Sequence, residues 1–342
     1  QTLPQAELHV APRWRDGLPG AQTIDLPLAE TLPRLLHDPS VSGLVVVLAV
    51  GATVRLLAPW LQGKDRDPAV VCVDEAGRFA VSLLSGHRGG ANALTETVAQ
   101  ALGACPVITT ASDSAGLPAV DLLGIDEGWR IDATPAALRR AAAAVVNGDP
   151  VGVYQEVGAT TWRQSCDWPT NVRSLDDLSD STVDGLAALL LITDRLLEAP
   201  TAPACQVVYR PPTLVAGIGC STGASAEDIA TTVELALAQG RLAPGSLALL
   251  ATIDRRLDEP GVIHYARQAG YEVQGFSAEA LAAVTAAPNP SPVVQAAVGT
   301  PGVCEPAALL ASGADTLLVP KVKTARATAA IARLATGRRG HV

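Results

Sequence analysis

The sequence has few aromatic residues, no long apolar run and fewer basic than acidic residues. These absences exclude several classes of protein. Aromatic residues make up 3% of the 342 positions. No apolar run approaches the ~20 residues that a membrane-spanning helix requires, and the first residues lack the pattern of a secretory signal. The net charge of −9 argues against general nucleic-acid binding. We therefore expect a cytoplasmic protein that binds neither membranes nor nucleic acids.

The six cysteines are widely spaced and include no C-x-x-C pair, which predicts a reduced protein without a zinc ribbon. Lysine is also scarce. Lys64, Lys321 and Lys323 are the only three in the chain, and all lie in motif-like segments. An acidic protein that confines its cations to loops can bind an anionic small molecule locally, although ordinary ion pairing would explain the same pattern equally well.

The remaining composition indicates an α/β protein. Alanine, valine and leucine are abundant, hydrophobic residues reach 48%, and apolar strand-like runs alternate with helical patterns. We predict three regions, with parallel or mixed sheets flanked by helices in both the N- and C-terminal domains. The predicted domains are residues 1–128, a middle connecting domain at 129–211, and residues 212–338. In such sheets, sites form at the C-terminal ends of parallel strands.

Periodicity and turn residues predict the individual elements. Predicted strands are 44–50, 69–74, 78–84, 106–109, 151–156, 186–193, 213–218, 246–253, 272–276 and 317–319. Predicted helices are 53–61, 92–102, 135–147, 226–239 and 262–269. Thr134 before Pro135 predicts a capped helix start, and Glu305 also has the position of an acidic residue at a helix start.

The most informative loop is Ser85-Gly86-His87-Arg88-Gly89-Gly90-Ala91-Asn92, which joins a strand to a helix. Glycines at such a turn let backbone N–H groups face a ligand, and the helix N-terminus adds partial positive charge. Histidine is the side chain most easily poised near neutral pH. The loop therefore predicts binding of an oxyanion or carboxylate, with His87 as a proton-transfer group beside it. The alternative is that His87 only forms a hydrogen bond within the turn.

A second glycine-rich turn, Gly217-x-Gly219-x-x-x-Gly223, weakly resembles a dinucleotide-binding fingerprint. Its spacing differs by one residue from the usual pattern, which makes simple anion binding the better interpretation. Cys220 precedes a helix, where a thiolate would be favoured, but a small loop residue without chemistry is the simpler alternative. Lys64 and Arg66, in the charged loop before residue 69, are placed to reach a ligand carboxylate. No G-x-S-x-G elbow, H-E-x-x-H or P-loop is present.

Together these motifs resemble the CbiG family, the cobalt-precorrin-5A hydrolases of anaerobic cobalamin synthesis, from about Gly43 to Lys323. The motifs are Gly51-x-x-Val54-Arg55-x-x-Ala58-Pro59, Lys64-x-x-Asp67-Pro68, Leu83-Leu84-Ser85-Gly86-His87-x-Gly89-Gly90-Ala91-Asn92, Pro106-x-Ile108-Thr109-Thr110, Asn147-Gly148-x-Pro150, Gly217-x-Gly219-Cys220, Ala251-Thr252-Ile253-Asp254 and Pro320-Lys321. Two departures stand out. The first residues, up to Gly20, carry no apolar first strand, which suggests a truncated or processed start. Arg255 stands where the family usually has lysine.

The resemblance implies a function. The substrate is a cobalt-containing tetrapyrrole fringed with carboxylates, so the cobalt arrives with the substrate, and neither a cofactor nor a metal site on the protein is expected. Water opens a ring-A acetate lactone, and a two-carbon fragment leaves as acetaldehyde, which gives cobalt-precorrin-5B. We expect His87 and Ser85 to be catalytic. The expected substrate-binding residues are Arg55, Lys64, Arg66, Gly86, Gly89, Gly90, Asn92, Gly219, Cys220, Ser221 and Lys321.

Two alternatives remain from the sequence. A corrinoid-binding or delivery protein would bind the tetrapyrrole without releasing acetaldehyde, and an NAD(P)-dependent oxidoreductase would use the Gly217 turn. Homodimer formation and contacts with other enzymes of the cobalamin pathway are further expectations that the resemblance suggests.

Overall fold

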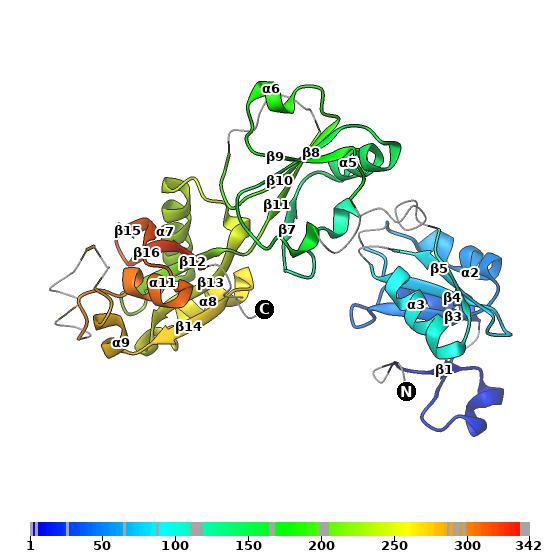
Figure 1. Cartoon of the computed structure of the whole chain (residues 1–342). Coiled ribbons are helices and arrows are strands. Elements are labelled where there is room, and N and C mark those ends of the chain that lie inside the picture. The colour runs from blue at the N-terminus through cyan, green and yellow to red at the C-terminus, as the bar shows by residue number, and fades with distance from the viewer. Residues whose placement is uncertain are drawn as a thin grey trace. The chain divides into compact units, whose positions relative to one another are not determined.

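Figure 1 shows a computed structural model of the chain. The structure describes residues 3, 6–24, 27–63, 66–86, 89–109, 119–163, 168–197, 205–285, 288–289, 295 and 299–335. The chain forms two compact units, Gln1–Leu122 and Leu123–Val342, and each is described by itself.

The first unit contains a four-stranded sheet in the order β3-β4-β5-β6. Its strands are β3 (Gly43–Val47), β4 (Ala69–Val73), β5 (Phe79–Leu84) and β6 (Cys105–Val107). The helices α1 (Leu28–Leu36), α2 (Val50–Leu57) and α3 (Ala91–Leu102) accompany it. Before them, the short strands β1 (His9–Val10) and β2 (Gln22–Thr23) pair with each other on either side of a 3-10 helix, Pro12–Gly17.

Strand direction decides which loops of this unit meet. β3 runs parallel to β4, but β5 is antiparallel to β4, with Leu84 opposite Val70, and β6 is parallel to β5. β5 and β6 therefore end at the edge where β3 and β4 begin. The tight turn after Asp74 reverses the chain, so β3 and β4 end at the opposite edge and the sheet is mixed.

The core of the first unit has two layers of side chains, one on each face of the sheet. All five residues of β4 are buried. Val71 and Val73 pack with Ala91 and Val98 of α3, whereas Val70 on the other face packs with residues of α1 and α2. Helices thus cover both faces, as the near-continuous apolar run of β4 predicts.

The second unit contains two five-stranded sheets. The first has the order β7-β11-β10-β8-β9. Its strands are β7 (Arg130–Asp132), β8 (Val151–Gln155), β9 (Val172–Leu175), β10 (Ala188–Ile192) and β11 (Gln206–Arg210). The helices are α5 (Pro135–Asn147) and the short α6 (Asp180–Val183). The predicted cap of α5 is confirmed, since the Thr134 side chain accepts from the Ala137 N–H at 3.1 Å.

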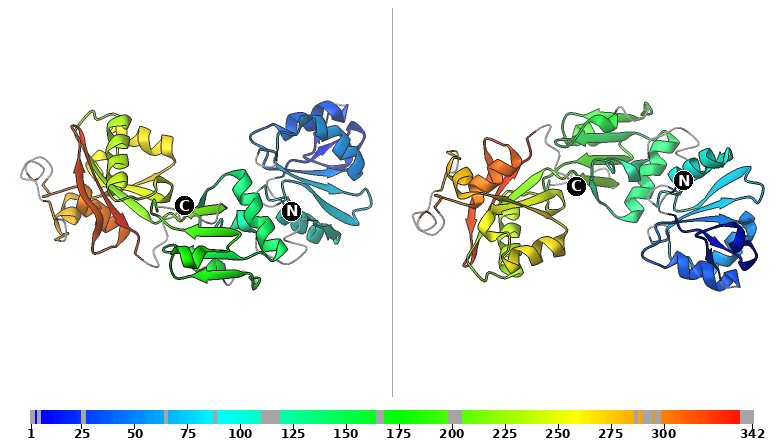
Figure 2. Two further views of the ribbon diagram at one scale, coloured as in Figure 1. Left: turned by 90° about the horizontal axis from the view of Figure 1, so that it is seen from above. Right: turned by 90° about the horizontal axis from the view of Figure 1, so that it is seen from below.

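The other sheet of this unit has the order β14-β13-β12-β16-β15, with the first three strands parallel and the last two antiparallel to their neighbours. Its strands are β12 (Leu214–Cys220), β13 (Leu247–Ile253), β14 (Glu272–Phe276), β15 (Leu317–Lys323) and β16 (Ala327–Arg333). Helices α7 (Ala226–Gln239) and α8 (Pro260–Ala269) pack on one face, and α9 (Ala278–Ala282) and α11 (Cys304–Ser312) on the other (Figure 2). The predicted α/β class with mixed sheets is confirmed.

Candidate functional site

Ser85 makes the turn that follows β5. Its backbone lies in the left-handed region with φ of 57°, which is uncommon for a residue other than glycine. Its hydroxyl donates to the carbonyl oxygen of Asp67 at 2.7 Å, and Asp67 lies just before β4. The serine side chain therefore ties the turn to the neighbouring loop and compensates for the unfavourable backbone conformation.

Beyond Ser85 the chain folds back on itself as α3 begins. The Ala91 N–H donates to the Ser85 carbonyl at 3.1 Å, and the Asn92 N–H donates to the Gly86 carbonyl at 2.9 Å. Asn92 also accepts from the Ser82 hydroxyl at 2.6 Å. The amide groups of Gly86, Gly89 and Gly90 have no acceptor within the described part of the chain. Unpaired N–H groups beside a helix N-terminus favour an anion.

The glycines of this turn are required by close contacts. A Cβ on Gly89 would lie 2.3 Å from the Ser85 Cβ and 2.7 Å from its carbonyl oxygen. A Cβ on Gly86 would lie 2.8 Å from the Asn92 side-chain oxygen, and Gly90 has a φ of +82°. Only glycine fits these positions without moving the turn.

We expect Gly89→Ala to open this turn. Overpacking of this kind typically costs about 1–3 kcal/mol of unfolding free energy, and a small displacement of a binding loop can lower turnover about a hundredfold. The matched control is Gly17→Ala in the same unit, since a Cβ there meets nothing within 4 Å. Urea unfolding and a turnover assay of both variants make the comparison, and equal activity of the two variants would contradict the expectation.

The loop before β4 shares this edge of the sheet. The Asp67 carboxylate accepts from the N–H groups of Gln62 and Gly63, both at 3.0 Å, which closes the loop around Asp67. Arg66 is exposed beside it. The structure thus brings Arg66 and the Ser85 turn to one edge. His87 and Lys64, two of the predicted site residues, lie outside the described residues.

Arg55, predicted to bind a carboxylate of the substrate, lies away from the Ser85 turn. It belongs to α2, and its guanidinium donates to the Gly51 carbonyl at 3.0 Å. Gly51 follows β3, which ends at the edge opposite to the Ser85 turn. The structure therefore does not bring the Arg55 guanidinium to the Ser85 turn.

Gly219, Cys220 and Ser221 lie where β12 ends in the second unit. The Ser221 N–H and hydroxyl both donate to the Arg326 carbonyl, at 2.9 and 3.2 Å. The Thr328 hydroxyl donates to the Gly219 carbonyl at 3.2 Å. A buried environment raises the pKa of Cys220, which outweighs the opposite effect of the Arg256 charge. The thiol form of Cys220 is therefore favoured, whereas the sequence pattern suggested a thiolate.

Three charged side chains that the sequence analysis did not assign to the site hold the turn after Ser221. The Glu259 carboxylate accepts from the Gly223 N–H at 2.6 Å and pairs with Arg256 at 2.7 Å. These bonds, the Gly223 N–H first, lower the pKa of Glu259. Arg326 donates to the Thr222 carbonyl at 3.0 Å. The sequence signal that could have identified this ion pair is the three-residue spacing of Arg256 and Glu259 at the start of a helix.

The glycines of the Gly217 turn have a packing role. A Cβ on Gly217 would lie 1.9 Å from the Cys304 carbonyl and 2.6 Å from the Ala308 nitrogen, so the backbone of α11 covers this glycine. A Cβ on Gly219 would lie 2.8 Å from the Thr328 hydroxyl. In a dinucleotide site these glycines would instead admit a pyrophosphate. The close approach of α11 thus accounts for Gly217 without a nucleotide.

Lys321 lies in β15, which continues past the predicted end at residue 319. Its ammonium group donates to the Asn289 carbonyl at 2.6 Å. The buried Glu305 carboxylate, 2% exposed, accepts from the Lys321 N–H and from the Asn289 side chain, at 2.9 and 2.7 Å. Glu305 lies in the first turn of α11, as predicted. Its carboxylate connects that helix start to β15 and to Asn289.

Within the described ranges, no group of three or more His, Cys, Asp or Glu side chains is arranged to hold a metal ion. In the same part of the chain, none of the helices combines the length and the hydrophobicity needed to cross a membrane.

Fold and geometry define a class, a multi-sheet α/β protein with glycine-rich turns at strand ends that suit anionic ligands. Three family models then match consecutive parts of the chain. They are Cobalamin synthesis G N-terminal at residues 37–113, Cobalamin biosynthesis central region at 118–211, and Cobalamin synthesis G C-terminus at 214–332. The chain belongs to the CbiG family, and the resemblance seen in its motifs is confirmed.

Individual relatives agree with this assignment. The chain is 38% identical over 304 residues to the cobalt-precorrin-5A hydrolase of Priestia megaterium, which covers 88% of this chain and 80% of that protein. It is 35% identical over 271 residues to the cobalt-precorrin-5A hydrolase of Salmonella typhimurium, covering 79% and 76%. It is also 40% identical over 129 residues to Protein CobE of a Sinorhizobium species, covering 36% and 81%.

Proposed function

We propose that this chain is a cobalt-precorrin-5A hydrolase of anaerobic cobalamin biosynthesis. It opens the ring-A acetate lactone of its substrate and releases the two-carbon fragment as acetaldehyde, which gives cobalt-precorrin-5B. The observation that carries the proposal is the identity of 38% and 35% to two proteins of that name over most of each chain.

The reaction has two chemical demands. Water adds to the lactone carbonyl, which releases a carboxylate and a hydroxyl group on the carbon that joined the lactone to the macrocycle. Loss of the hydroxyl proton then drives cleavage of the carbon–carbon bond, and the macrocycle carbon takes a proton as acetaldehyde leaves. Both steps need a base, and both develop negative charge that hydrogen-bond donors can stabilise.

In this proposal the Ser85 turn meets both demands. His87 moves the protons, and the amide groups of Gly86, Gly89 and Gly90 stabilise the developing charge. The support is that these amides have no acceptor among the described residues and lie at the N-terminus of α3. The Ser85 hydroxyl donates to Asp67, so Ser85 contributes by holding the turn in place.

Substrate binding is assigned to residues of both units. Arg66 and Lys64 belong to the segment before β4, and Asn92 follows the Ser85 turn in the sequence, whereas Gly219, Cys220, Ser221 and Lys321 lie in the second unit. Arg55 binds a peripheral carboxylate of the substrate, away from the turn. We further propose that the enzyme needs no cofactor, because the cobalt belongs to the substrate, and that it works in the cytoplasm, as a homodimer, beside other enzymes of the pathway.

The test is acetaldehyde release from cobalt-precorrin-5A by the purified chain under anaerobic conditions. We expect stoichiometric acetaldehyde together with the matching loss of mass from the corrinoid. Tight corrinoid binding without acetaldehyde would contradict the hydrolase and favour the delivery protein. A fluorescence titration with NAD(P)H tests the remaining alternative, because binding of NAD(P)H would favour the oxidoreductase.

A further inference from the structure

A cavity of about 300 Å³ lies where the two sheets of the second unit meet. Glu156, after β8, and Arg195, after β10, line it from the middle sheet. Gly240 and Leu242, after α7, and Leu318 and Arg333, from β15 and β16, line it from the C-terminal sheet. The sequence analysis assigned no role to the residues of this cavity, and none of them belongs to the site proposed above.

Hydrogen bonds fix the two walls relative to each other. The segment 194–196 pairs antiparallel with 241–243: the Ala243 N–H donates to the Asp194 carbonyl and the Leu196 N–H to the Arg241 carbonyl, both at 2.7 Å. The Arg210 guanidinium donates to the Arg195 carbonyl at 2.7 Å and to the Thr193 carbonyl at 3.2 Å. The backbone that carries Arg195 is therefore positioned before any ligand arrives.

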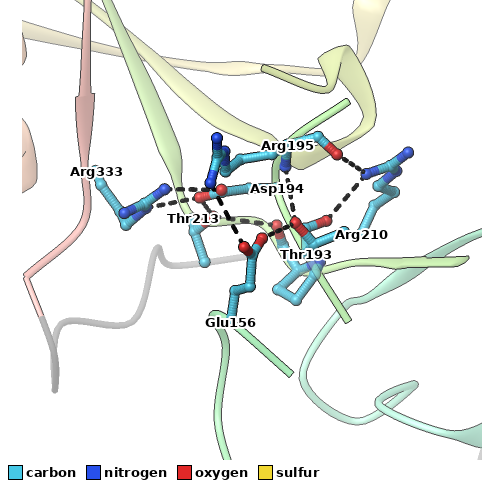
Figure 3. A network of polar contacts seen from close by, with 8 residues as sticks. Glu156, Thr193, Asp194, Arg195, Arg210, Thr213 and Arg333 are labelled. Carbon is cyan, nitrogen blue, oxygen red and sulfur yellow. Dashed lines mark hydrogen bonds and ion pairs between the residues drawn. The ribbon is translucent and has the colours of Figure 1, made fainter. Parts of the chain in front are cut away.

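An ion pair with the buried Asp194 places Arg333 at the wall (Figure 3). Asp194, whose side chain is fully buried, accepts from the Arg333 Nε at 2.7 Å and from its Nη2 at 2.8 Å. These two bonds neutralise Asp194 and fix the plane of the guanidinium. A guanidinium has five N–H donors in a rigid arrangement, so Arg333 keeps donors beyond those that Asp194 uses.

Arg195 is the more available cation. Its side chain is 52% exposed, and its Nη1 lies 3.6 Å from the Glu156 Oε1, which is longer than a hydrogen bond. Glu156 does not depend on this contact, because its carboxylate already accepts from the Thr193 hydroxyl and from the Tyr154 hydroxyl. Arg195 can therefore turn toward a ligand without leaving Glu156 unpaired.

We propose that this cavity binds a carboxylate group through Arg195 and the remaining donors of Arg333. The lining carries two guanidinium groups and one carboxylate, and that carboxylate is already hydrogen-bonded. Planar guanidinium groups suit carboxylate geometry. The volume is at the lower limit of ligand pockets, so it admits a carboxylate-bearing side chain and excludes a whole tetrapyrrole. That the carboxylate belongs to the corrinoid substrate rests on the proposed function; a free small carboxylate has the same chemistry.

The test measures binding of two probes, cobyrinic acid and propionate, by isothermal titration calorimetry to the full chain. Fully methyl-esterified cobyrinic acid serves as the probe without carboxylates. Three variants are compared: Arg195→Gln, Arg195→Lys, and Arg139→Gln as the control, an exposed arginine on α5 away from the cavity lining. Unchanged melting temperatures establish that the variants are folded.

We expect Arg195→Gln to weaken binding of cobyrinic acid about tenfold or more, the loss typical of a charge-assisted hydrogen bond. Arg195→Lys should retain most of the affinity for cobyrinic acid, and Arg139→Gln should retain all of it. The methyl ester should bind equally to the wild type and to Arg195→Gln. If only propionate binding falls with Arg195→Gln, the cavity serves a free carboxylate. If no carboxylate probe binds more weakly to Arg195→Gln than to the wild type, the assignment is wrong.

The outcome separates this assignment from the proposed function. Acetaldehyde release by the wild type together with unaltered carboxylate affinity in Arg195→Gln would overturn the cavity assignment alone. An inactive wild type whose affinity for cobyrinic acid still depends on Arg195 would overturn the hydrolase assignment alone.

Discussion

Replacing Asp194 with alanine is expected to lower the free energy of unfolding of the second unit by about 3 kcal/mol. The side chain is fully buried and accepts from Arg333 twice and from the Thr213 hydroxyl at 2.8 Å. Removing it leaves a guanidinium without its counter-charge. The value is at the lower end of the range for breaking a buried pair, because the Arg333 side chain remains 36% exposed and water can reach it.

Urea unfolding of the full chain, followed by circular dichroism and tryptophan fluorescence, measures this loss. The matched control is Asp132→Ala, which removes another acid that pairs with an arginine of this unit. Asp132 pairs with Arg210 at 3.4 Å, but its side chain is 69% exposed, so we expect a change of roughly 0–1 kcal/mol. The double variant Asp194→Ala/Arg333→Leu should recover stability, since it removes the unpaired charge as well. A loss in Asp194→Ala no larger than in Asp132→Ala would contradict the prediction.

Replacing His87 with alanine is expected to lower turnover of cobalt-precorrin-5A about a hundredfold to ten-thousandfold, the usual range for a positioned proton-transfer group. Binding of the corrinoid should change little, because the amides of Gly86, Gly89 and Gly90 remain. The Gly89 and Gly90 amides belong to a turn that is held by the bond from Ser85 to Asp67 and by the bonds from the start of α3. The measurement is acetaldehyde release under single-turnover conditions beside a corrinoid titration.

Two further readouts separate proton transfer from a structural role of His87. The pH profile of the wild type should show an ionisation in the range of histidine, and His87→Ala should lose it. Added imidazole should restore part of the activity if the missing group is a base. The control is His264→Ala, an exposed histidine of α8. Normal turnover in His87→Ala would refute its assigned role, and the turn would then act through its backbone alone.

Elements with a strong local pattern were predicted well. The helix predicted at 226–239 matches α7, where Ser225 and Asp228 form a reciprocal cap, and the strand predicted at 272–276 matches β14. Glu259 precedes α8 and Thr134 caps α5. These features depend on residues a few positions apart, so local sequence is sufficient to specify them.

Strands without such a pattern were missed. β16 is rich in alanine, which has low strand propensity. It forms because β12 and β15 pair with it and because its small side chains let α7 pack on one face and α11 on the other. β11 lies between β7 and β10 with Val207 and Tyr209 fully buried, yet the sequence analysis predicted no strand there. β15 continues through Pro320, which an edge strand tolerates.

The candidate site also combines features that the local sequence predicts with features that depend on strand pairing. The glycine requirement of the Ser85 turn follows from its sequence, whereas the bond from Ser85 to Asp67 depends on the antiparallel pairing of β4 and β5. The placement of Arg55 depends on the same reversal of direction. The sequence analysis did not predict the cavity at Arg195, because Glu156, Arg195, Leu242 and Arg333 come from four distant segments.

The sequence by itself determined the α/β class, most helices, the glycine-rich turns and the CbiG family, since each rests on short-range patterns or on blocks of residues in a fixed order. Only the tertiary structure decided which strand ends share an edge, that α11 covers Gly217, and that Asp194 and Arg333 form a buried pair beside a cavity. These properties depend on strand direction and on contacts between residues as far apart as Asp194 and Arg333. Such residues come together only in the folded chain, because a local sequence pattern does not specify contacts between distant segments.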